Sequence, residues 1–144
     1  MSTHSMISVK LPDGRVRSIY CHFDGHIRTN GRMLLENYNS QELAEQVTSL
    51  GHISYLAQKF EPSPESKHCF SDPEFMVTVV YSRDRGEEDQ TPYIWHSEED
   101  FMNDCHREEY NYFFKDGEWY VDTTIDGIPT WTKLSGVFQE NELF

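Results

Sequence analysis

The feature that most restricts the fold is a run of alternating aromatic residues beside a tight turn. The turn is Asp116-Gly117, a dipeptide typical of two-residue β-hairpin loops. Trp119 lies on the segment that follows it, and the aromatic side chains before it recur at every second position, at Tyr110, Tyr112 and Phe114. Because successive side chains of a strand point to opposite faces, these three share one face. The pattern predicts an antiparallel hairpin with an aromatic face.

A second hairpin is predicted near the N-terminus. Residues 7–11 and 16–23 alternate between apolar and polar side chains, as half-buried strands do, and Pro12-Asp13-Gly14 between them is a turn sequence. Two further strands are indicated, a β-branched and aromatic one at residues 75–82 and a short one at residues 93–95.

The clearest helix is predicted after Asn39 or Ser40, either of which is a suitable N-cap residue. Its apolar side chains Leu43, Val47 and Leu50 recur at helical spacing, and we expect them to pack against a sheet. Shorter helices are indicated at residues 31–38 and 97–105, and a strand or short helix at residues 131–138.

Together these elements predict an α+β fold, because strands that pair as hairpins with inserted helices fit this class better than βαβ units do. We expect a single domain, residues 1–144, with a mainly antiparallel sheet and two or three short helices. Only 37% of the residues are hydrophobic, so the large aromatic ones, Trp119 among them, have to be buried to offset the entropy of ordering the chain. The alternative is that the aromatic hairpin face is an exposed docking patch.

The sequence also bears on location and on metal binding. Residues 1–10 hold no apolar secretory segment, and no stretch approaches the roughly 20 apolar residues that span a bilayer. The three cysteines are a poor disulfide framework, so we expect a cytoplasmic protein without a membrane partner. Each cysteine has a histidine neighbour, but no Cys-x-x-Cys spacing is present, and buried free cysteines are common. We expect neither a metal nor a cofactor, with zinc at these pairs as the less favoured alternative: Cys21-His22, His68-Cys69 and Cys105-His106.

Charge is distributed unevenly along the chain. Residues 1–70 carry seven basic and seven acidic side chains, whereas residues 71–126 carry sixteen acidic and four basic ones, a net charge of −12. Such a block repels nucleic acid and attracts basic surfaces, although a solvated face that only maintains solubility explains the pattern equally well. The candidate partner-binding residues are Asp84, Glu87, Glu88, Asp89, Glu98, Glu99, Asp100, Asp104, Glu108 and Glu109.

Two pairs of side chains are candidates for a small-ligand or enzymatic site. His22 and Asp24 stand at the end of a predicted strand, where a loop could present them as an acid–base pair. Arg83 and Arg85 alternate at the end of another, which would aim both guanidinium groups at one carboxylate or phosphate. The simpler interpretations are a turn at Asp24-Gly25 and ion pairs from the arginines to nearby acids. No P-loop, Gly-x-Ser-x-Gly or glycine-rich dinucleotide turn is present, so no catalytic residue is assigned.

Several segments resemble a family of small phage and prophage proteins. They read RSIYCHFDG, LLENY, LGHISYL, YSRDRGE and DGEWY, and they occur in the family's order at residues 17–25, 34–38, 50–56, 81–87 and 116–120. The match spans about residues 7–121 and departs at Gly25-His26-Ile27-Arg28, where the family has a Tyr-Pro-x-Gly-type loop. The resemblance implies phage origin and expression in a bacterial cytoplasm, and it brings no established activity.

These observations favour a binding protein over an enzyme. The expectation is an acidic phage accessory protein that binds and inhibits a host nucleic-acid enzyme or defence factor, as a mimic of nucleic acid. Its partner would be a host protein with a basic surface, and it would not bind nucleic acid itself. The alternative is a small-ligand-binding or enzymatic domain that uses the His22/Asp24 and Arg83/Arg85 pairs.

Overall fold

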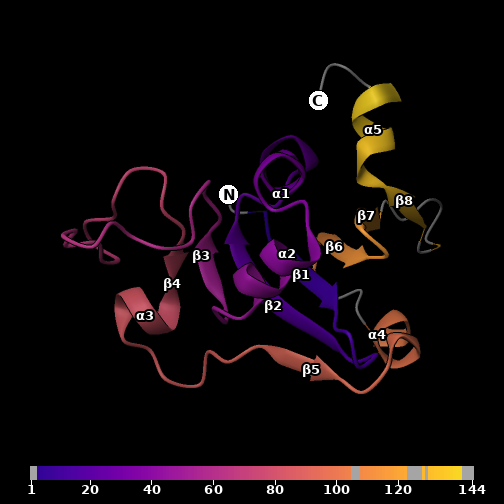
Figure 1. The fold of residues 1–144 in the computed structure, drawn as a ribbon, viewed down its shortest axis with the longest axis horizontal. Coiled ribbons are helices and arrows are strands. Elements are labelled where there is room, and N and C mark those ends of the chain that lie inside the picture. The colour runs from indigo at the N-terminus through magenta and orange to yellow at the C-terminus, as the bar shows by residue number, and fades with distance from the viewer. Residues whose placement is uncertain (1–2, 105–107, 123–127, 129, 141–144) are drawn as a thin grey trace.

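The computed structural model describes residues 3–104, 108–122, 128 and 130–140. Within them, strands form one mixed sheet in the order β4-β3-β2-β1-β6-β7-β8, with β5 beside β2 (Figure 1). The strands are β1 (Ser5–Lys10), β2 (Val16–Phe23), β3 (Ile53–Tyr55), β4 (Val79–Val80), β5 (Tyr93–Trp95), β6 (Tyr110–Lys115), β7 (Glu118–Asp122) and β8 (Trp131–Lys133). Together with the helices, this sheet confirms the predicted α+β class.

The predicted hairpins are present and most strand pairs are antiparallel, as expected, but the sheet is mixed and not purely antiparallel. Strands β1 and β2 pair antiparallel, as do β6 and β7, where Asp116 and Gly117 form the turn with φ angles of 51° and 80°. Between these hairpins β1 pairs parallel with β6, and β2 pairs parallel with β3. Hairpin signals are local in sequence, whereas these parallel pairs join segments far apart along the chain, so no local pattern indicated them.

Most of the helices lie near segments where the sequence predicted them, but the π-helix and the helix after β4 were not predicted. They are η1, a π-helix (Ile27–Gly31), α1 (Arg32–Asn37), α2 (Gln41–Thr48), α3 (Tyr81–Arg85), α4 (Glu98–Asp104) and α5 (Leu134–Glu140). At the start of α2 the Ser40 hydroxyl accepts from the backbone N–H of Leu43 at 3.1 Å, and at the start of α4 the Ser97 hydroxyl accepts from Asp100 at the same distance. Within the described residues, no helix is both long and apolar enough to cross a bilayer.

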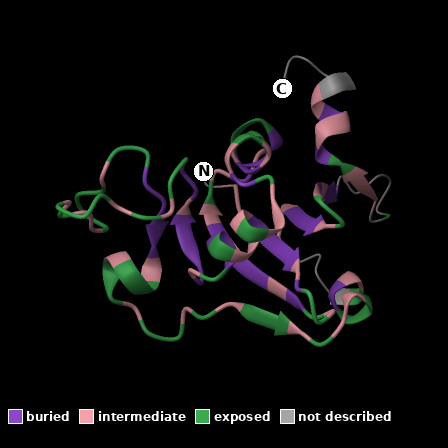
Figure 2. Ribbon diagram, viewed as in Figure 1, coloured by how far each residue is buried: buried purple, intermediate pink, exposed green. Residues whose placement is uncertain are grey.

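The main core lies between the sheet and the helices η1, α1 and α2 (Figure 2). Tyr112, Phe114 and Trp119 are fully buried in it, which confirms the predicted aromatic core, while Tyr110 is only half-buried. The rings of Phe114 and Trp119 lie 5.2 Å apart, and the Trp119 indole N–H donates to the Tyr38 carbonyl at 3.0 Å. From α2 and the turn that follows it, one predicted core residue is fully buried and two pack against the cluster at its margin: Val47, Leu43 and Leu50.

A smaller apolar cluster covers part of the other face of the sheet. It consists of Val16, Phe101 and Phe113, with the partly buried rings of Trp95 and Trp131 around it. It attaches α4 and β5 to the sheet, because the Phe101 ring lies 4.5 Å from that of Phe113.

The predicted strand at residues 75–82 is wrong over most of its length. Only Val79 and Val80 pair with β3, Met76 has a positive φ of 67°, and the helix α3 begins directly afterwards. Burial produced the misleading pattern, since residues 77–80 are all inside the protein, whereas Val77 and Thr78 pair only with Lys59, outside any strand. The Asp84 carboxylate accepts from the Val80 N–H at 2.7 Å, a side-chain bond that accompanies the turn into α3.

Candidate functional site

The acidic residues gather at the two ends of one surface segment, which we call the acidic strap and define as residues 86–100. It leaves α3, runs through β5 and enters α4 along one edge of the molecule (Figure 1). Its first end exposes Glu88 and Asp89, and its second end exposes Glu99 and Asp100. The strap therefore separates the predicted acidic face into two groups with β5 between them.

The centre of the strap is apolar and exposed. Tyr93 and Ile94 are 42% and 46% exposed, which places them among the exposed large apolar side chains of the described residues. Strand β5 pairs with the first half of β2, and its other edge meets no strand in the described part of the chain. An unpaired strand edge with exposed apolar side chains is a surface on which another chain can dock.

Further contacts fix the strap to the fold in addition to the pairing of β5 with β2. The Trp95 indole N–H donates to the Ser18 hydroxyl at 3.0 Å, and the His52 N–H donates to the Gln90 carbonyl at 3.0 Å. The Tyr93 ring packs beside the His52 ring, with 4.9 Å between centroids. Burial lowers the pKa of His52, whose Nδ1 accepts from the Tyr20 N–H at 2.9 Å. The exposed side chains of the strap are thus carried by an anchored backbone.

Two predicted partner-binding acids are engaged inside the protein. Glu98 bridges Lys10 at 3.1 Å and Lys115 at 3.0 Å; its partial burial favours the protonated form, but the two ammonium groups outweigh this and lower its pKa. Asp84 has a side chain only 2% exposed, held by His68 and Arg83. Neither carboxylate is available to a partner without breaking an ion pair of the fold.

The remaining predicted acids are less central to the strap. Glu87 lies 3.7 Å from Arg85 and is partly exposed. Glu109 is exposed beyond α4, where its carboxylate accepts from the His4 N–H at 3.5 Å, and Glu108 is half-buried. The side chain of Asp104 lies outside the described residues.

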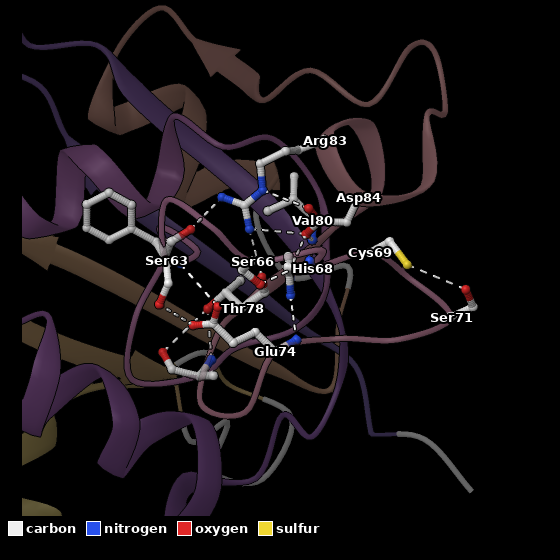
Figure 3. Close-up of polar contacts among 12 residues, drawn as sticks. Ser63, Ser66, His68, Cys69, Ser71, Glu74, Thr78, Val80, Arg83 and Asp84 are labelled. Carbon is white, nitrogen blue, oxygen red and sulfur yellow. Dashed lines mark hydrogen bonds and ion pairs between the residues drawn. The ribbon is translucent and has the colours of Figure 1, made fainter.

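The buried Asp84 carboxylate organises a polar network around α3 (Figure 3). His68 Nδ1 accepts from the Glu74 N–H at 2.8 Å, which leaves the proton on Nε2, 2.9 Å from Asp84. Arg83 donates to both Asp84 oxygens and to the carbonyls of Phe60 and Thr78. Burial disfavours the charged form of Asp84, but the bonds from Arg83 and Val80 outweigh it and lower the pKa of the carboxyl. The network fastens the loop of residues 60–78 onto α3.

The predicted arginine pincer is not formed. Arg83 and Arg85 belong to a helix, so residues two apart point in different directions rather than the same way. Arg83 donates hydrogen bonds within the Asp84 network. Arg85 stacks 4.6 Å above the Phe70 ring and lies near Glu87. The simpler interpretation, ion pairing within the chain, describes both arginines.

His22 and Asp24 do not form an acid–base pair with each other or with these arginines. Asp24 closes a turn, where its carboxylate lies 3.4 Å from the His26 N–H. His22 joins a ring cluster that sequence reasoning missed: the Tyr20 hydroxyl lies 2.8 Å from His22 Nδ1 and 3.0 Å from His4 Nδ1. His4 Nδ1 is also 2.7 Å from the His22 carbonyl. Alternation along β2 placed Tyr20 and His22 on one face, but nothing local brought in His4.

The described cysteines differ in burial. Cys21 is fully buried, which raises its pKa to about 11, and it accepts from the Asn30 amide at 3.3 Å. Its neighbour His22 points to the other face, as strand geometry predicted. Cys69 is half-exposed, but His68 is turned toward Asp84. Over the described residues no three His, Cys, Asp or Glu side chains are grouped as a metal site, and Cys105-His106 lies outside them.

Comparison with models of protein families, with curated proteins and with solved structures gave no match. The site is therefore interpreted from its own geometry and from the motifs of the sequence.

Proposed function

We propose that the protein is a binding protein, not an enzyme, and that it attaches to a basic surface of a bacterial host protein through the acidic strap. The layout of the strap carries this proposal: exposed Tyr93 and Ile94 lie at its centre, and exposed carboxylates lie at both of its ends. Protein interfaces commonly combine an aromatic, apolar centre with a polar rim. Charges on the rim steer a partner of opposite sign and speed its association.

The chemistry of the strap favours a partner that handles nucleic acid. Such proteins hold rows of Lys and Arg side chains that contact successive phosphates. Carboxylates at two separate ends of the strap would occupy such a row, and the molecule's net charge of −13 keeps nucleic acid itself away. We therefore infer inhibition of a host nucleic-acid enzyme or defence factor in the bacterial cytoplasm, in keeping with the resemblance to phage proteins.

The test is capture of a host protein from bacterial lysate on the immobilised protein. A basic protein should be retained, released by salt, and displaced by added nucleic acid. The triple variant Glu88→Lys, Glu99→Lys and Asp100→Lys should lose this capture, since it reverses exposed charges at both ends of the strap. Asp84 and Glu98 are left unchanged because their ion pairs belong to the fold.

A matched control reverses the same number of exposed acids in the loop that the Asp84 network fastens: Glu61→Lys, Glu65→Lys and Asp72→Lys. Its net charge equals that of the strap variant, so a nonspecific charge effect would weaken both equally. Capture that is lost equally in both variants, or retained in both, would rule out the strap as the binding surface. Melting temperatures of the two variants establish that each is folded.

A further inference from the structure

A pocket of about 390 Å³ lies away from the acidic strap, at the ends of β2 and β3. Phe23 and Asp24 line it where β2 ends, and Tyr55 and Leu56 line it where β3 ends. The helices η1 and α1 form the opposite wall, with Arg28 among their contributions. Its volume falls in the range of about 300–1,000 Å³ that small-molecule sites occupy.

The topology of the sheet accounts for this position. Strands β2 and β3 are parallel and Phe23 pairs with Tyr55, so the carboxyl ends of both strands open at the same edge. In sheets with parallel strands, ligands commonly bind in the crevice outside these carboxyl ends. The adjoining η1 is a π-helix, a form that is rare and often found at functional sites.

One wall of the pocket offers aromatic surface. Phe23 is 41% exposed although it is a large apolar side chain. Its ring lies 5.5 Å from that of Tyr55, tilted by 45°. Exposed rings of this kind provide a surface against which a planar, π-bonded ligand can stack.

Two polar side chains of the lining, those of Arg28 and Gln58, are left over by the fold. Within the described part of the chain, the side chains of Arg28 and Gln58 make no hydrogen bond or ion pair. Gln58 can donate and accept, as recognition of a nucleobase edge requires, and Arg28 offers a planar guanidinium group for a phosphate. Arg28 and Arg32 balance Asp24 and Glu36 on the lining, so the pocket is locally neutral in a protein with a net charge of −13.

We propose that this pocket binds a nucleoside monophosphate, with the base stacked against Phe23 and Tyr55 and the phosphate paired with Arg28. One phosphate matches the guanidinium group of Arg28, which has no hydrogen-bond or ion-pair partner among the described residues. Additional phosphates would add negative charge beside Asp24 and Glu36 and in the field of the whole protein. The site is independent of the strap, so its occupancy and the capture of a partner are separate properties.

The experiment is calorimetric or NMR titration of the purified full chain with AMP, GMP, CMP and UMP, and with adenosine and inorganic phosphate. At least one monophosphate should bind saturably and more tightly than either adenosine or phosphate alone. Arg28→Gln should weaken monophosphate binding by at least about tenfold while leaving nucleoside binding unchanged. Arg15→Gln is the matched control, because Arg15 is an exposed arginine paired with Asp13 in a turn outside the pocket.

Phe23→Ala should weaken the nucleoside and the monophosphate together, since it removes the stacking surface. The proposal is overturned if no monophosphate binds saturably, or if Arg28→Gln and Arg15→Gln have the same affinity as the unaltered protein. Because Arg28 is exposed and has no partner in the described chain, its substitution leaves the fold intact, and the melting temperature verifies this.

Discussion

At the scale of single residues, a carboxylate counted from the sequence is not the same as a carboxylate available to a partner. Asp84 and Glu98 both belong to the acidic block, yet each is held between cationic or hydrogen-bonding groups of the fold. Four other acids of the same block are exposed in the structure: Glu88, Asp89, Glu99 and Asp100. Composition alone cannot separate the two kinds, because the distinction depends on Lys10, His68 and Lys115, which are distant in sequence.

Asp84→Asn should destabilise the protein by roughly 3 kcal/mol, because it leaves the Arg83 guanidinium without its buried counter-charge. The folded-state pKa of Asp84 lies below the ordinary value of 3.8, so its charge stabilises the fold above that value, and this contribution is lost as the pH falls through the folded pKa. The difference in melting temperature between wild type and variant should therefore be present at neutral pH and shrink in strong acid. Asp72→Asn, at an exposed position, is the control.

At the scale of elements, local chemistry decided what the sequence could predict. Capping serines and the Asp116-Gly117 turn act within a few residues, so α2, α4 and the β6–β7 hairpin followed from the sequence. The parallel strand pairs depend on contacts between distant segments, and so does the irregular chain path over most of residues 75–82, where a strand was predicted. No local sequence pattern indicates such contacts. The candidate surfaces divide in the same way: the acids of the strap were identified, whereas the pocket required the parallel pairing of β2 and β3.

Substitutions at two glycines test whether the strap packs against the chain at Gly51. Gly51 and Gly86 both have positive φ, at 84° and 72°, but a Cβ at Gly51 would collide with the Gln90 carbonyl oxygen, whereas a Cβ at Gly86 would meet open space. Gly86→Ala should therefore cost only about 1 kcal/mol of backbone strain, and Gly51→Ala should cost clearly more. Gly51→Ala alone should also accelerate amide exchange at residues 90–95. Equal costs for the two variants would show that the strap does not rest on Gly51.

At the scale of the whole molecule, β2 connects the two proposed surfaces. Its first half pairs with β5 and so carries the strap, and its last residues pair with β3 and so border the pocket. Both positions depend on the sheet that the main core supports, in which β2 contributes Ile19 and Cys21 to one face. A loss of the core should therefore remove both surfaces together, whereas a change in either surface should leave the other intact.

Trp119→Ala tests this dependence. The indole is 1% exposed, packs against Phe114 and donates to the Tyr38 carbonyl, so its removal leaves a cavity and an unpaired carbonyl at the centre of the core. The variant should lose roughly 3–5 kcal/mol of unfolding free energy, a large part of what a domain of this size has. Denaturant titration measures this, with Tyr120→Ala as the control at a half-exposed position on the opposite face of β7. If Trp119→Ala instead kept its unfolding free energy and lost only partner capture, the aromatic hairpin would be the interface, and neither the core assignment nor the role of the strap would stand.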